Sequence, residues 1–431
     1  MTYREVQFEM KDSGVEWIAQ IPKNWQVKRL KNLFSFGKGL PITKADLVEN
    51  GVAVISYGQI HAKSNTGTHL SKELLRFVPE IFLETNPSSL ISKHDIIFAD
   101  TSEDLDGLGN AVLMDIDGKV FAGYHTIILH PIDTRFSKYL AYLFLTDAWR
   151  SQLRASANGI KVFSVTQKML RSCNVILPYT KECDIITSFL DTQCIKIDSI
   201  ISEAKASIEE YKSWKASIIY EAVTKGLDSD VEMKDSGVEW IGKMPTHWLL
   251  SRVKNETKNL DYLREPISAE NRDNKLGLYD YYGASGVIDK IDDYNVDDTV
   301  LLIGEDGANL RMRNLPLVYR ASGKFWVNNH AHILKVNEQN NYSYMAYLLE
   351  AGDYTTYITG AAQPKLSQFN LMRFPIPIAP RQEQDAIEEY LNKKTGEIQS
   401  LIAEKESLIA DLESYKKSLI FEVVTGKRRV V

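Results

Sequence analysis

The stretch MKDSGVEWIAQIPKNW, from Met10 to Trp25, returns as MKDSGVEWIGKMPTHW from Met233 to Trp248, with eleven of sixteen positions identical. The two copies begin 223 positions apart. A second pair, KASIIYEAVTKG at Lys215–Gly226 and KKSLIFEVVTGK at Lys416–Lys427, closes each copy. The repeat covers nearly the whole chain and predicts two similar halves. Two similar halves favour a target that also has two similar halves.

Composition places the chain among multidomain globular proteins. Its 431 residues are too many for one ordinary core, and 44% of them are apolar. The sequence has no run of about 18 apolar residues and no apolar stretch near its N-terminus, which predicts a cytoplasmic protein without a membrane span or signal peptide. Cys173, Cys183 and Cys194 show no CxxC spacing, so we expect reduced thiols rather than disulfides or a zinc site.

The net charge of −6 argues against strong nucleic-acid binding by the whole surface, because phosphate contacts require clustered Lys and Arg. Local clusters can still provide such contacts. Most of these clusters are interpreted as ordinary solvated surface charge. The alternative is that they bind phosphate groups. The clusters are Lys23, Lys28, Arg29 and Lys31; Lys161, Lys168 and Arg171; and Arg311, Arg313, Arg320 and Lys324.

Four segments are expected along the chain: a first α/β domain at 1–180, a helix at 181–227, a second α/β domain at 228–380 and a helix at 381–431. In the first domain, short apolar runs predict strands at 52–56, 95–99 and 126–129, and an amphipathic pattern predicts a helix over 137–155. Residues 182–225 contain neither Pro nor Gly, which predicts one long helix that ends at Gly226.

Both long helices carry apolar residues in a heptad pattern, and the two series superpose with a constant offset of 201 residues. Lys215 and Lys416 interrupt the series at equivalent positions. The residues expected to pack the helices together are Leu190, Ile197, Ile201, Ile208, Tyr211 and Ile218 in the first helix, and Leu391, Ile398, Ile402, Ile409, Leu412 and Leu419 in the second.

Two amphipathic helices of about 40 residues, each about 60 Å long, would bury these stripes most simply as an antiparallel pair. Such a pair would hold the globular domains apart. The alternative is that each helix packs only on its own domain.

The repeated phrase contains Ser-x-x-Glu, Ser13 with Glu16 and Ser236 with Glu239, which is the spacing of a capping box at a short helical turn. The tryptophans of the phrase are expected to anchor that turn to the domain core. These are Trp17, Trp25, Trp240 and Trp248.

Motifs for catalysis are absent from the sequence. There is no GxxxxGK[ST] phosphate loop, no dinucleotide fingerprint and no Asn-Pro-Pro-aromatic tetrad of adenine methyltransferases. His330 and His332, in NNHAHIL, lack other ligands at metal-binding spacing. Because His125 occurs in the similar run GYHTIIL, we interpret His125 and His330 as a shared position of the fold.

Two loops place polar and aromatic side chains beside glycine, YGQIH at Tyr57–His61 and YDYYGAS at Tyr279–Ser285. Such side chains can read base edges or hold phosphates, although Tyr-Gly turns are also common in any α/β protein. The candidate DNA-binding residues are Tyr57, Gln59, His61, Lys63, Lys161, Tyr279, Tyr281, Tyr282, Ser285, Arg311 and Arg313.

Together these features resemble the specificity subunit of Type I restriction-modification systems. The resemblance rests on two variable domains each followed by a heptad helix, the phrase KDSGVEWIG, the loops YGQIH and YYGASGVID, and the exit FPIPIAPRQEQ at Phe374–Gln384. It covers essentially the full length. The first copy departs from it, because its exit NVILPYTKECD at Asn174–Asp184 lacks the Arg-Gln-Glu-Gln of the second.

The resemblance implies an α+β fold with two α/β target recognition domains in tandem repeat, separated by two long antiparallel coiled-coil helices. It implies a non-catalytic bacterial or archaeal subunit that binds an asymmetric, bipartite site in double-stranded DNA. Two methyltransferase subunits and two restriction subunits would be its partners. S-adenosylmethionine, ATP and Mg would be cofactors of those partners, with none in this chain. The alternatives are a coiled-coil scaffold that joins two proteins without reading DNA, and a DNA-processing enzyme with an unrecognised site in acidic loops such as Ser102–Gly107.

Overall fold

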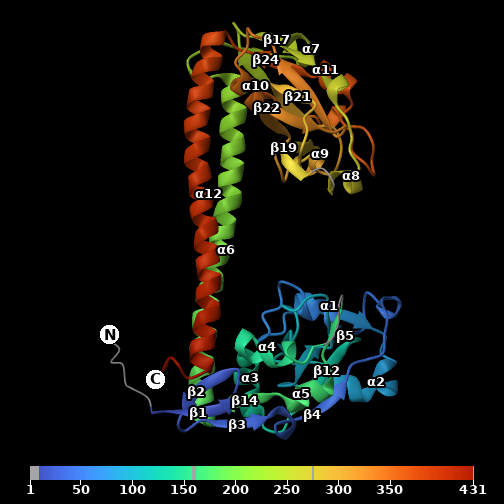
Figure 1. Ribbon diagram of the computed structural model, residues 1–431, viewed down its shortest axis with the longest axis vertical. Coiled ribbons are helices and arrows are strands. Elements are labelled where there is room, and N and C mark those ends of the chain that lie inside the picture. The colour runs from blue at the N-terminus through green and yellow to red at the C-terminus, as the bar shows by residue number, and fades with distance from the viewer. Residues whose placement is uncertain (1–8, 158–161, 274–275, 431) are drawn as a thin grey trace. The chain divides into compact units, whose positions relative to one another are not determined.

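The structure is a computed structural model that describes residues 9–157, 162–273 and 276–430. The chain forms two compact units, unit 1 with Met1–Glu203 and Leu408–Val431, and unit 2 with Ala204–Ser407. Each unit contains one globular part and a stretch of both long helices, α6 (Thr180–Lys225) and α12 (Arg381–Val424) (Figure 1). The four consecutive segments expected from the sequence are therefore grouped differently in space, because each long helix contributes its two halves to different units.

The repeated phrase forms a β-hairpin in each unit. Strand β1 (Met10–Val15) pairs antiparallel with β2 (Ile18–Pro22), and β15 (Met233–Asp235) pairs with β16 (Lys243–Pro245). The expected capping box is therefore wrong. The Ser13 hydroxyl accepts a hydrogen bond from the Val15 amide at 3.1 Å and donates to the carbonyl of Ile18. A serine at this spacing can cap a turn between strands as readily as a helical turn.

The tryptophans of the phrase pack into the cores, which confirms their predicted anchoring role. Trp25 and Trp248 are buried, and Trp17 and Trp240 are partly buried against the same clusters. In unit 2, the Trp248 ring nitrogen donates to Glu383 at 2.9 Å, and Trp240 stacks on Phe374 with ring centroids 5.2 Å apart. The hairpin is thus fixed to the start of α12 within unit 2.

Unit 1 contains two four-stranded sheets, in the orders β10-β8-β12-β4 and β6-β5-β11-β7, with smaller pairs β14-β3 and β13-β9. The runs expected at 52–56, 95–99 and 126–129 become β5, β8 and β12. The strand bounds are Gln26–Arg29 (β3), Phe34–Lys38 (β4), Val52–Ile55 (β5), Arg76–Val78 (β6), Leu90–Ile91 (β7), Ile96–Ala99 (β8), Thr101–Ser102 (β9), Ala111–Leu113 (β10), Val120–Ala122 (β11), Thr126–Pro131 (β12), Phe163–Ser164 (β13) and Asn174–Leu177 (β14).

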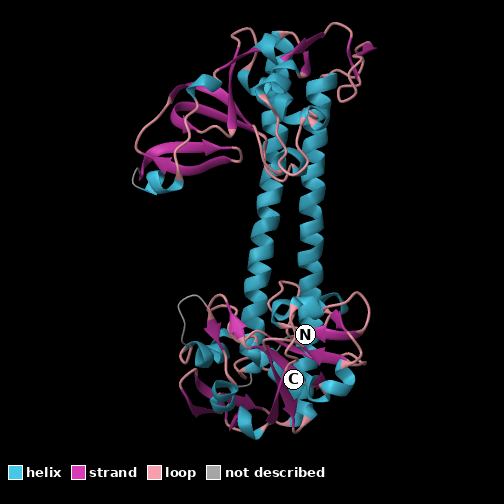
Figure 2. Cartoon of the chain, turned by 90° about the vertical axis from the view of Figure 1, so that its right-hand side faces the viewer, coloured by secondary structure: helices cyan, strands magenta, loops and turns pink. Residues whose placement is uncertain are grey.

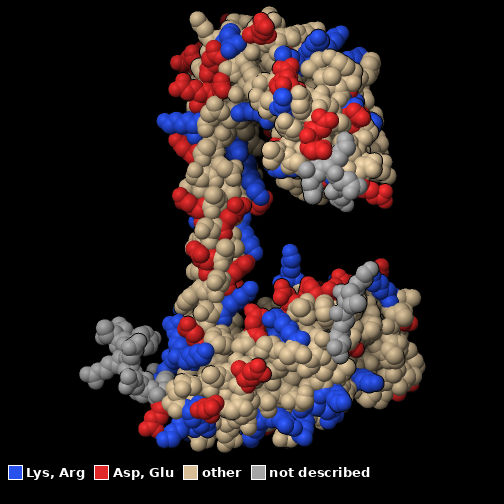
Figure 3. Space-filling view, viewed as in Figure 1, with Lys and Arg blue, Asp and Glu red and all other residues tan. Residues whose placement is uncertain are grey.

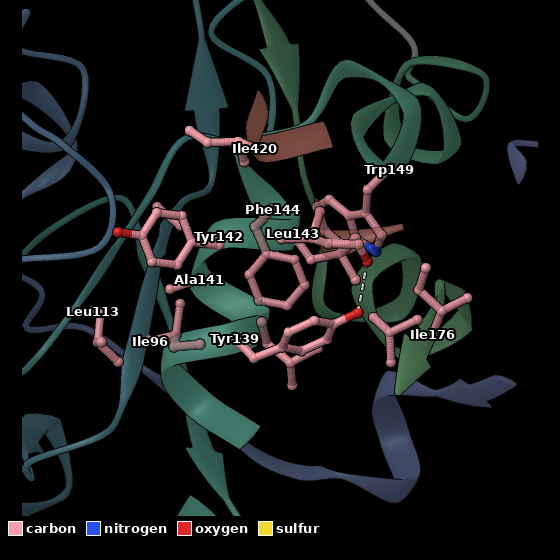
Figure 4. Close-up of a cluster of buried hydrophobic side chains, with 14 of the residues drawn as sticks. Ile96, Leu113, Tyr139, Ala141, Tyr142, Leu143, Phe144, Trp149, Ile176 and Ile420 are labelled. Carbon is pink, nitrogen blue, oxygen red and sulfur yellow. Dashed lines mark hydrogen bonds between the residues drawn. The ribbon is translucent and has the colours of Figure 1, made fainter. Parts of the chain in front are cut away.

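The helices of unit 1 cover these sheets and join their core to the long helices. The single helix expected over 137–155 is two helices, because the Thr146 side chain accepts from the Trp149 amide and starts a new one. The Tyr139 hydroxyl donates to the Val424 carbonyl at 2.8 Å, which links the domain to the end of α12 (Figure 4). The helix bounds are Tyr57–Ile60 (α1), Phe82–Thr85 (α2), Ser137–Phe144 (α3), Asp147–Arg154 (α4) and Gln167–Ser172 (α5).

Unit 2 is built on a six-stranded sheet in the order β18-β23-β21-β22-β19-β20, with the pair β17-β24 beside it. Figure 2 shows the strands of each unit with its shorter helices around them. The bounds are Leu249–Arg252 (β17), Thr257–Asn259 (β18), Leu276–Gly283 (β19), Gly286–Ile291 (β20), Val296–Gly304 (β21), Val318–Val327 (β22), Ala331–Val336 (β23), Pro375–Ile378 (β24), Val253–Glu256 (α7), Ala269–Asp273 (α8), Asn309–Met312 (α9), Tyr342–Ala351 (α10) and Gln368–Arg373 (α11).

Helix α6 ends where the sequence predicted, since Gly226 adopts a left-handed backbone with φ of +79°. In each unit the local stretches of α6 and α12 lie side by side (Figures 1 and 2). The expected heptad residues are all buried or partly buried. In unit 1 the apolar cluster joins residues of both helices with residues of the domain, so helix pairing and domain packing occur together.

The two lysines that interrupt the heptads form cross-helix hydrogen bonds. In unit 1, the Lys416 ammonium lies 2.7 Å from both carboxylate oxygens of Asp198. In unit 2, the Lys215 ammonium donates to the Gln399 side chain at 3.1 Å. Asp198 and Gln399 are themselves separated by the 201-residue offset of the repeat, so the two contacts are equivalent. Both fit one antiparallel register.

Three further features of the described residues bear on function. Their helices are each too short or too polar to cross a membrane. Within the same ranges, no group of three or more His, Cys, Asp or Glu side chains could hold a metal ion. The three cysteines are free and buried, and burial raises the pKa of Cys173 and Cys183 to about 12. Buried thiols of this kind are poor nucleophiles.

Candidate nucleic-acid interface

In unit 1, a histidine lies at the end of the two central strands β8 and β12. The Asp100 amide donates to the His125 carbonyl at 3.0 Å, and the Val165 amide donates to the Asp100 carbonyl at 2.8 Å. The His125 ring nitrogen Nδ1 lies 3.0 Å from the Asp100 carboxylate. Both side chains are partly exposed, His125 by 52% and Asp100 by 32%. Three chain segments thus meet at a polar, solvent-facing point.

Two cavities flank this point, and His125 lines both. One has a volume of about 1000 Å³ and is bordered by Lys38, Lys44 and Lys168. The other, of about 740 Å³, is bordered by Tyr57 and the loop after β9. The Tyr57 ring meets His125 and Tyr124 edge to face, at 5.5 Å and 5.1 Å between centroids. The histidine–carboxylate pair and the aromatic rings therefore lie between two cavities, and three lysines border the larger one.

Two predicted DNA contacts in YGQIH have internal roles instead. The segment is the short helix α1, not a loop, and the Gln59 side chain accepts from the Ser56 amide at 3.1 Å as a capping box. Both ring nitrogens of His61 are occupied, Nε2 by the Thr101 carbonyl at 2.7 Å and Nδ1 by Asn110 at 3.0 Å. His61 therefore has no ring nitrogen left for a base. Tyr57 lines the smaller cavity, and Lys63, which follows the segment in sequence, is exposed.

Unit 2 repeats the strand-end arrangement on different residues. The Glu305 amide donates to the His330 carbonyl at 2.8 Å, and the Leu366 amide donates to the Glu305 carbonyl at 2.8 Å. The His330 ring nitrogen Nδ1 lies 2.7 Å from the Asp306 carboxylate. His330 is 51% exposed and Asp306 33% exposed, close to the values of the unit 1 pair. The sequence interpretation of His125 and His330 as one shared fold position is confirmed by these backbone pairings.

Behind this pair lies a charged network that the sequence did not predict. Glu305 pairs with Arg264 and, at 3.0 Å, with Lys365. Asp261 pairs with the buried His332 at 2.6 Å. Burial by itself raises the pKa of Glu305, but hydrogen bonds from Arg264 and Lys365 outweigh it and leave that pKa below its ordinary value. The network therefore holds a buried carboxylate in its charged form.

The predicted loop YDYYGAS is mostly strand, and its residues divide by face. Tyr281 is only 1% exposed, and its hydroxyl accepts from the Ile267 amide at 3.0 Å, so it is a packing residue and its predicted DNA contact is wrong. Tyr282 is partly buried against Phe325. Tyr279 is partly exposed and meets Tyr294, and Ser285 is exposed at the hairpin turn. Successive side chains of a strand point to opposite faces of the sheet. Residues that a loop could have exposed together are therefore divided between a buried and a more exposed face.

The predicted arginines bind backbone of their own unit. Arg313 donates to the carbonyls of Glu350 and Gly352, and Arg311 donates to the Gly360 carbonyl at 3.1 Å. Arg313 also has a left-handed backbone, with φ of +51°. These bonds use one nitrogen of the guanidinium, and Arg313 is exposed, so its phosphate contact stays a prediction. Lys161 lies outside the described residues.

Charge is mixed over the faces seen in Figure 3, where Lys and Arg alternate with Asp and Glu. The cavity lysines of unit 1 are therefore local features in a surface of mixed sign. A surface of mixed charge is not suited to strong non-specific binding of DNA. It is better suited to base contacts that a few phosphate contacts support.

The fold defines a class: two copies of a sheet-based domain and two long antiparallel helices in one chain. The family model of the Type I restriction modification DNA specificity domain matches residues 22–210 and 258–408, and the chain belongs to this family. It is a specificity subunit of that class and not the catalytic component.

Similar proteins and a similar solved structure agree with this family assignment. The specificity subunit named for the type I enzyme MjaX of Methanocaldococcus jannaschii is 22% identical over 99% of this chain and 98% of its own length. A specificity subunit named S.HindORF215P, from Haemophilus influenzae, is 30% identical, but over 38% of this chain and 39% of its own length. A chain solved in a study of assembly and conformational transition of the type I R-M system has a TM-score of 0.70, with 15% identity, 95% of this chain covered and 99% of that chain. The α+β fold with two domains and two long helices is thereby confirmed.

Proposed function

We propose that this chain reads an asymmetric, bipartite site in double-stranded DNA, one half-site with each globular domain. The observation that carries the proposal is the repeated strand-end site, built on the same backbone pairings in both units but surrounded by different side chains. A common framework with different surroundings fits two readers with two different targets. Membership of the specificity-domain family supports DNA as that target.

In unit 1, the lysines beside the strand-end site are suited to the DNA backbone. Lys38, Lys44 and Lys168 border the larger cavity, and contacts of this kind set position and register rather than sequence. The remaining candidate contacts are at least partly exposed, and they are Tyr57, Lys63, Tyr279, Ser285, Arg311 and Arg313. The net charge of −6 implies that partner subunits share in enclosing the DNA.

The partners are methyltransferase and restriction subunits, in the proposed ratio of two of each per specificity chain. The methyltransferase subunits would bring S-adenosylmethionine and modify one adenine in each half-site. The restriction subunits would bring ATP hydrolysis and Mg-dependent cleavage. This chain would direct both activities to the recognised DNA sequence.

The long helices act as the spacer between half-sites. Helix α6 has 46 residues and α12 has 44, which corresponds to about 69 Å and 66 Å at 1.5 Å per residue. One turn of B-DNA spans about 34–36 Å. Half-sites one to two turns apart are therefore within reach of a spacer of this length.

Methylation mapping tests the proposal. Single-molecule methylome sequencing of cells that express this chain with its methyltransferase subunits should reveal one adenine-methylated, asymmetric sequence with a fixed gap. Purified complex should then bind that duplex in a gel shift, and scrambling either half should weaken binding. Equal binding to the mapped and scrambled duplexes would leave the chain as a protein scaffold. Methyl transfer or ATP hydrolysis by the chain without partners would make it an enzyme.

A further inference from the structure

The histidine–carboxylate pair at the strand end recurs in both units and, in the part of the chain that the structure describes, leaves one ring nitrogen of each histidine unused. In both units, Nδ1 of the imidazole faces the carboxylate and therefore donates to it. Within the described ranges, the other ring nitrogen, Nε2, makes no hydrogen bond in either His125 or His330. By contrast, both nitrogens of His61 and His332 are bound inside their domains. His69 pairs with Asp115 in the same way, so the pair alone does not mark a reader. His125 and His330 differ from it because they occupy equivalent positions at the strand ends of the two units.

We propose that His125 and His330 are the equivalent base-reading residues of the two domains, each accepting a hydrogen bond from the exocyclic amino group of an adenine or a cytosine. The inference rests on the proposed function and assigns two residues to it. A neutral imidazole that donates from Nδ1 presents a lone pair at Nε2, and these amino groups are the donors that DNA bases display in the major groove.

The carboxylate of each pair favours a base over a phosphate as the ligand of Nε2. Asp100 and Asp306 are each about one-third exposed and lie within 3.0 Å of their imidazoles. A phosphate placed at Nε2 would approach this negative charge, whereas an amino group would be attracted by it. The lysines that border the larger cavity, Lys38, Lys44 and Lys168, are better placed for phosphates.

Each pair is held rigidly, which a specificity determinant requires. In unit 1, the rings of Tyr57 and Tyr124 pack against His125 at 5.5 Å and 5.3 Å between centroids. In unit 2, the His330 amide donates to the Asn328 side chain at 2.8 Å, and residues 306 and 365 pair as an isolated β-bridge. Ring contacts support the imidazole in unit 1 and backbone contacts support the pair in unit 2, so the two domains can present the same group to different bases.

The test compares His125→Asn and His330→Asn in complex with the methyltransferase subunits. Asparagine tolerates the left-handed backbone of His125 and keeps a donor near the Nδ1 position, but it removes Nε2. Binding is measured by fluorescence anisotropy on the mapped duplex and on duplexes with each base pair substituted singly. His125→Asn should weaken binding about 5- to 100-fold and abolish discrimination at one A or C position, in the first domain's half-site only. His330→Asn should do the same in the other half-site.

Two further variants separate reading from folding. Glutamine places its amide near the Nε2 position, so His125→Gln should restore part of the discrimination. His69→Asn removes a similar exposed pair, His69 with Asp115 at 2.7 Å, and should leave DNA binding unchanged.

Three results would overturn the inference. The first is that both variants discriminate between bases as the wild type does. The second is that both variants lose discrimination in the same half-site. The third is that binding weakens equally for all sequences and depends less on salt, which marks a phosphate contact. If the wild-type complex itself does not distinguish the mapped duplex from a scrambled one, the proposed function fails instead.

Discussion

Arg264 bridges two carboxylates that lie far apart in sequence. It pairs with Glu305 and lies 3.5 Å from Asp261, and these two side chains are exposed by 9% or less. Burial opposes the charge of both acids, yet their partners lower the pKa of each below its ordinary value. Removing the cation would leave Glu305 with Lys365 and Asp261 with His332, so the buried charge would lose part of its compensation.

Because each carboxylate keeps one further partner, Arg264→Met should lower the free energy of unfolding of unit 2 by about 1–3 kcal/mol at neutral pH. A carboxylate with a lowered pKa in the folded state contributes stability that is present above its unfolded pKa and lost as pH falls through the folded pKa. The cost of the variant should accordingly shrink below about pH 4 as Glu305 and Asp261 become protonated. Urea denaturation followed by tryptophan fluorescence, repeated from pH 7 to pH 3, measures both effects.

Arg135→Met provides the control, because its pair with Asp133 is exposed and screened by solvent, so its loss should change stability much less. Equal losses in the two variants would contradict the assigned importance of the buried network. At this scale the sequence predicted residue types but not partners. His332 and Asp261 are 71 positions apart, and only the folded sheet brings them together.

Among the elements, the long helices were the most predictable, because 201-residue spacing and heptads are both periodic signals. The bounds of α6, its stop at Gly226 and the start of α12 follow from local sequence, whereas α12 ends at Val424, before the expected 431. The capping box and the loop YDYYGAS were not predictable in the same way. A short motif fits several local structures, and pairing with distant strands selects one.

The cross-helix contact of Lys416 with Asp198 can be tested by charge reversal. Asp198→Lys places two ammonium groups together and should destabilise unit 1 by up to about 1 kcal/mol, because the pair is partly exposed. Adding Lys416→Asp should recover that loss, and the double-mutant cycle measures the coupling. The equivalent change in unit 2, Gln399→Asp, should stabilise by a few tenths of a kcal/mol, since it gives Lys215 a carboxylate partner. Zero coupling in the cycle would contradict a stabilising contact between Lys416 and Asp198.

For the whole molecule, helix length is predicted to set the gap between half-sites. Four residues inserted between Ser202 and Ser207 add about 6 Å to the first helix. In the register set by the lysine contacts, the matching insertion falls between Ser407 and Leu412. With both insertions, methylome sequencing should show the same half-site bases and a gap longer by about two base pairs, at 3.4 Å each. Altered half-site bases with an unchanged gap would refute the spacer role.

The sequence by itself determined the duplication, the α+β class, the two helices and membership in a DNA-specificity family, because repeats and heptads are written in consecutive residues. Tertiary structure decided which side chains face solvent at the strand ends. Burial and an internal hydrogen bond remove Tyr281 as a candidate contact, and His125 and His330 are the exposed pair that the two units share. The physical reason is that a hydrogen-bonding group becomes available to DNA only after the fold has satisfied its own polar groups, and those partners come from distant segments.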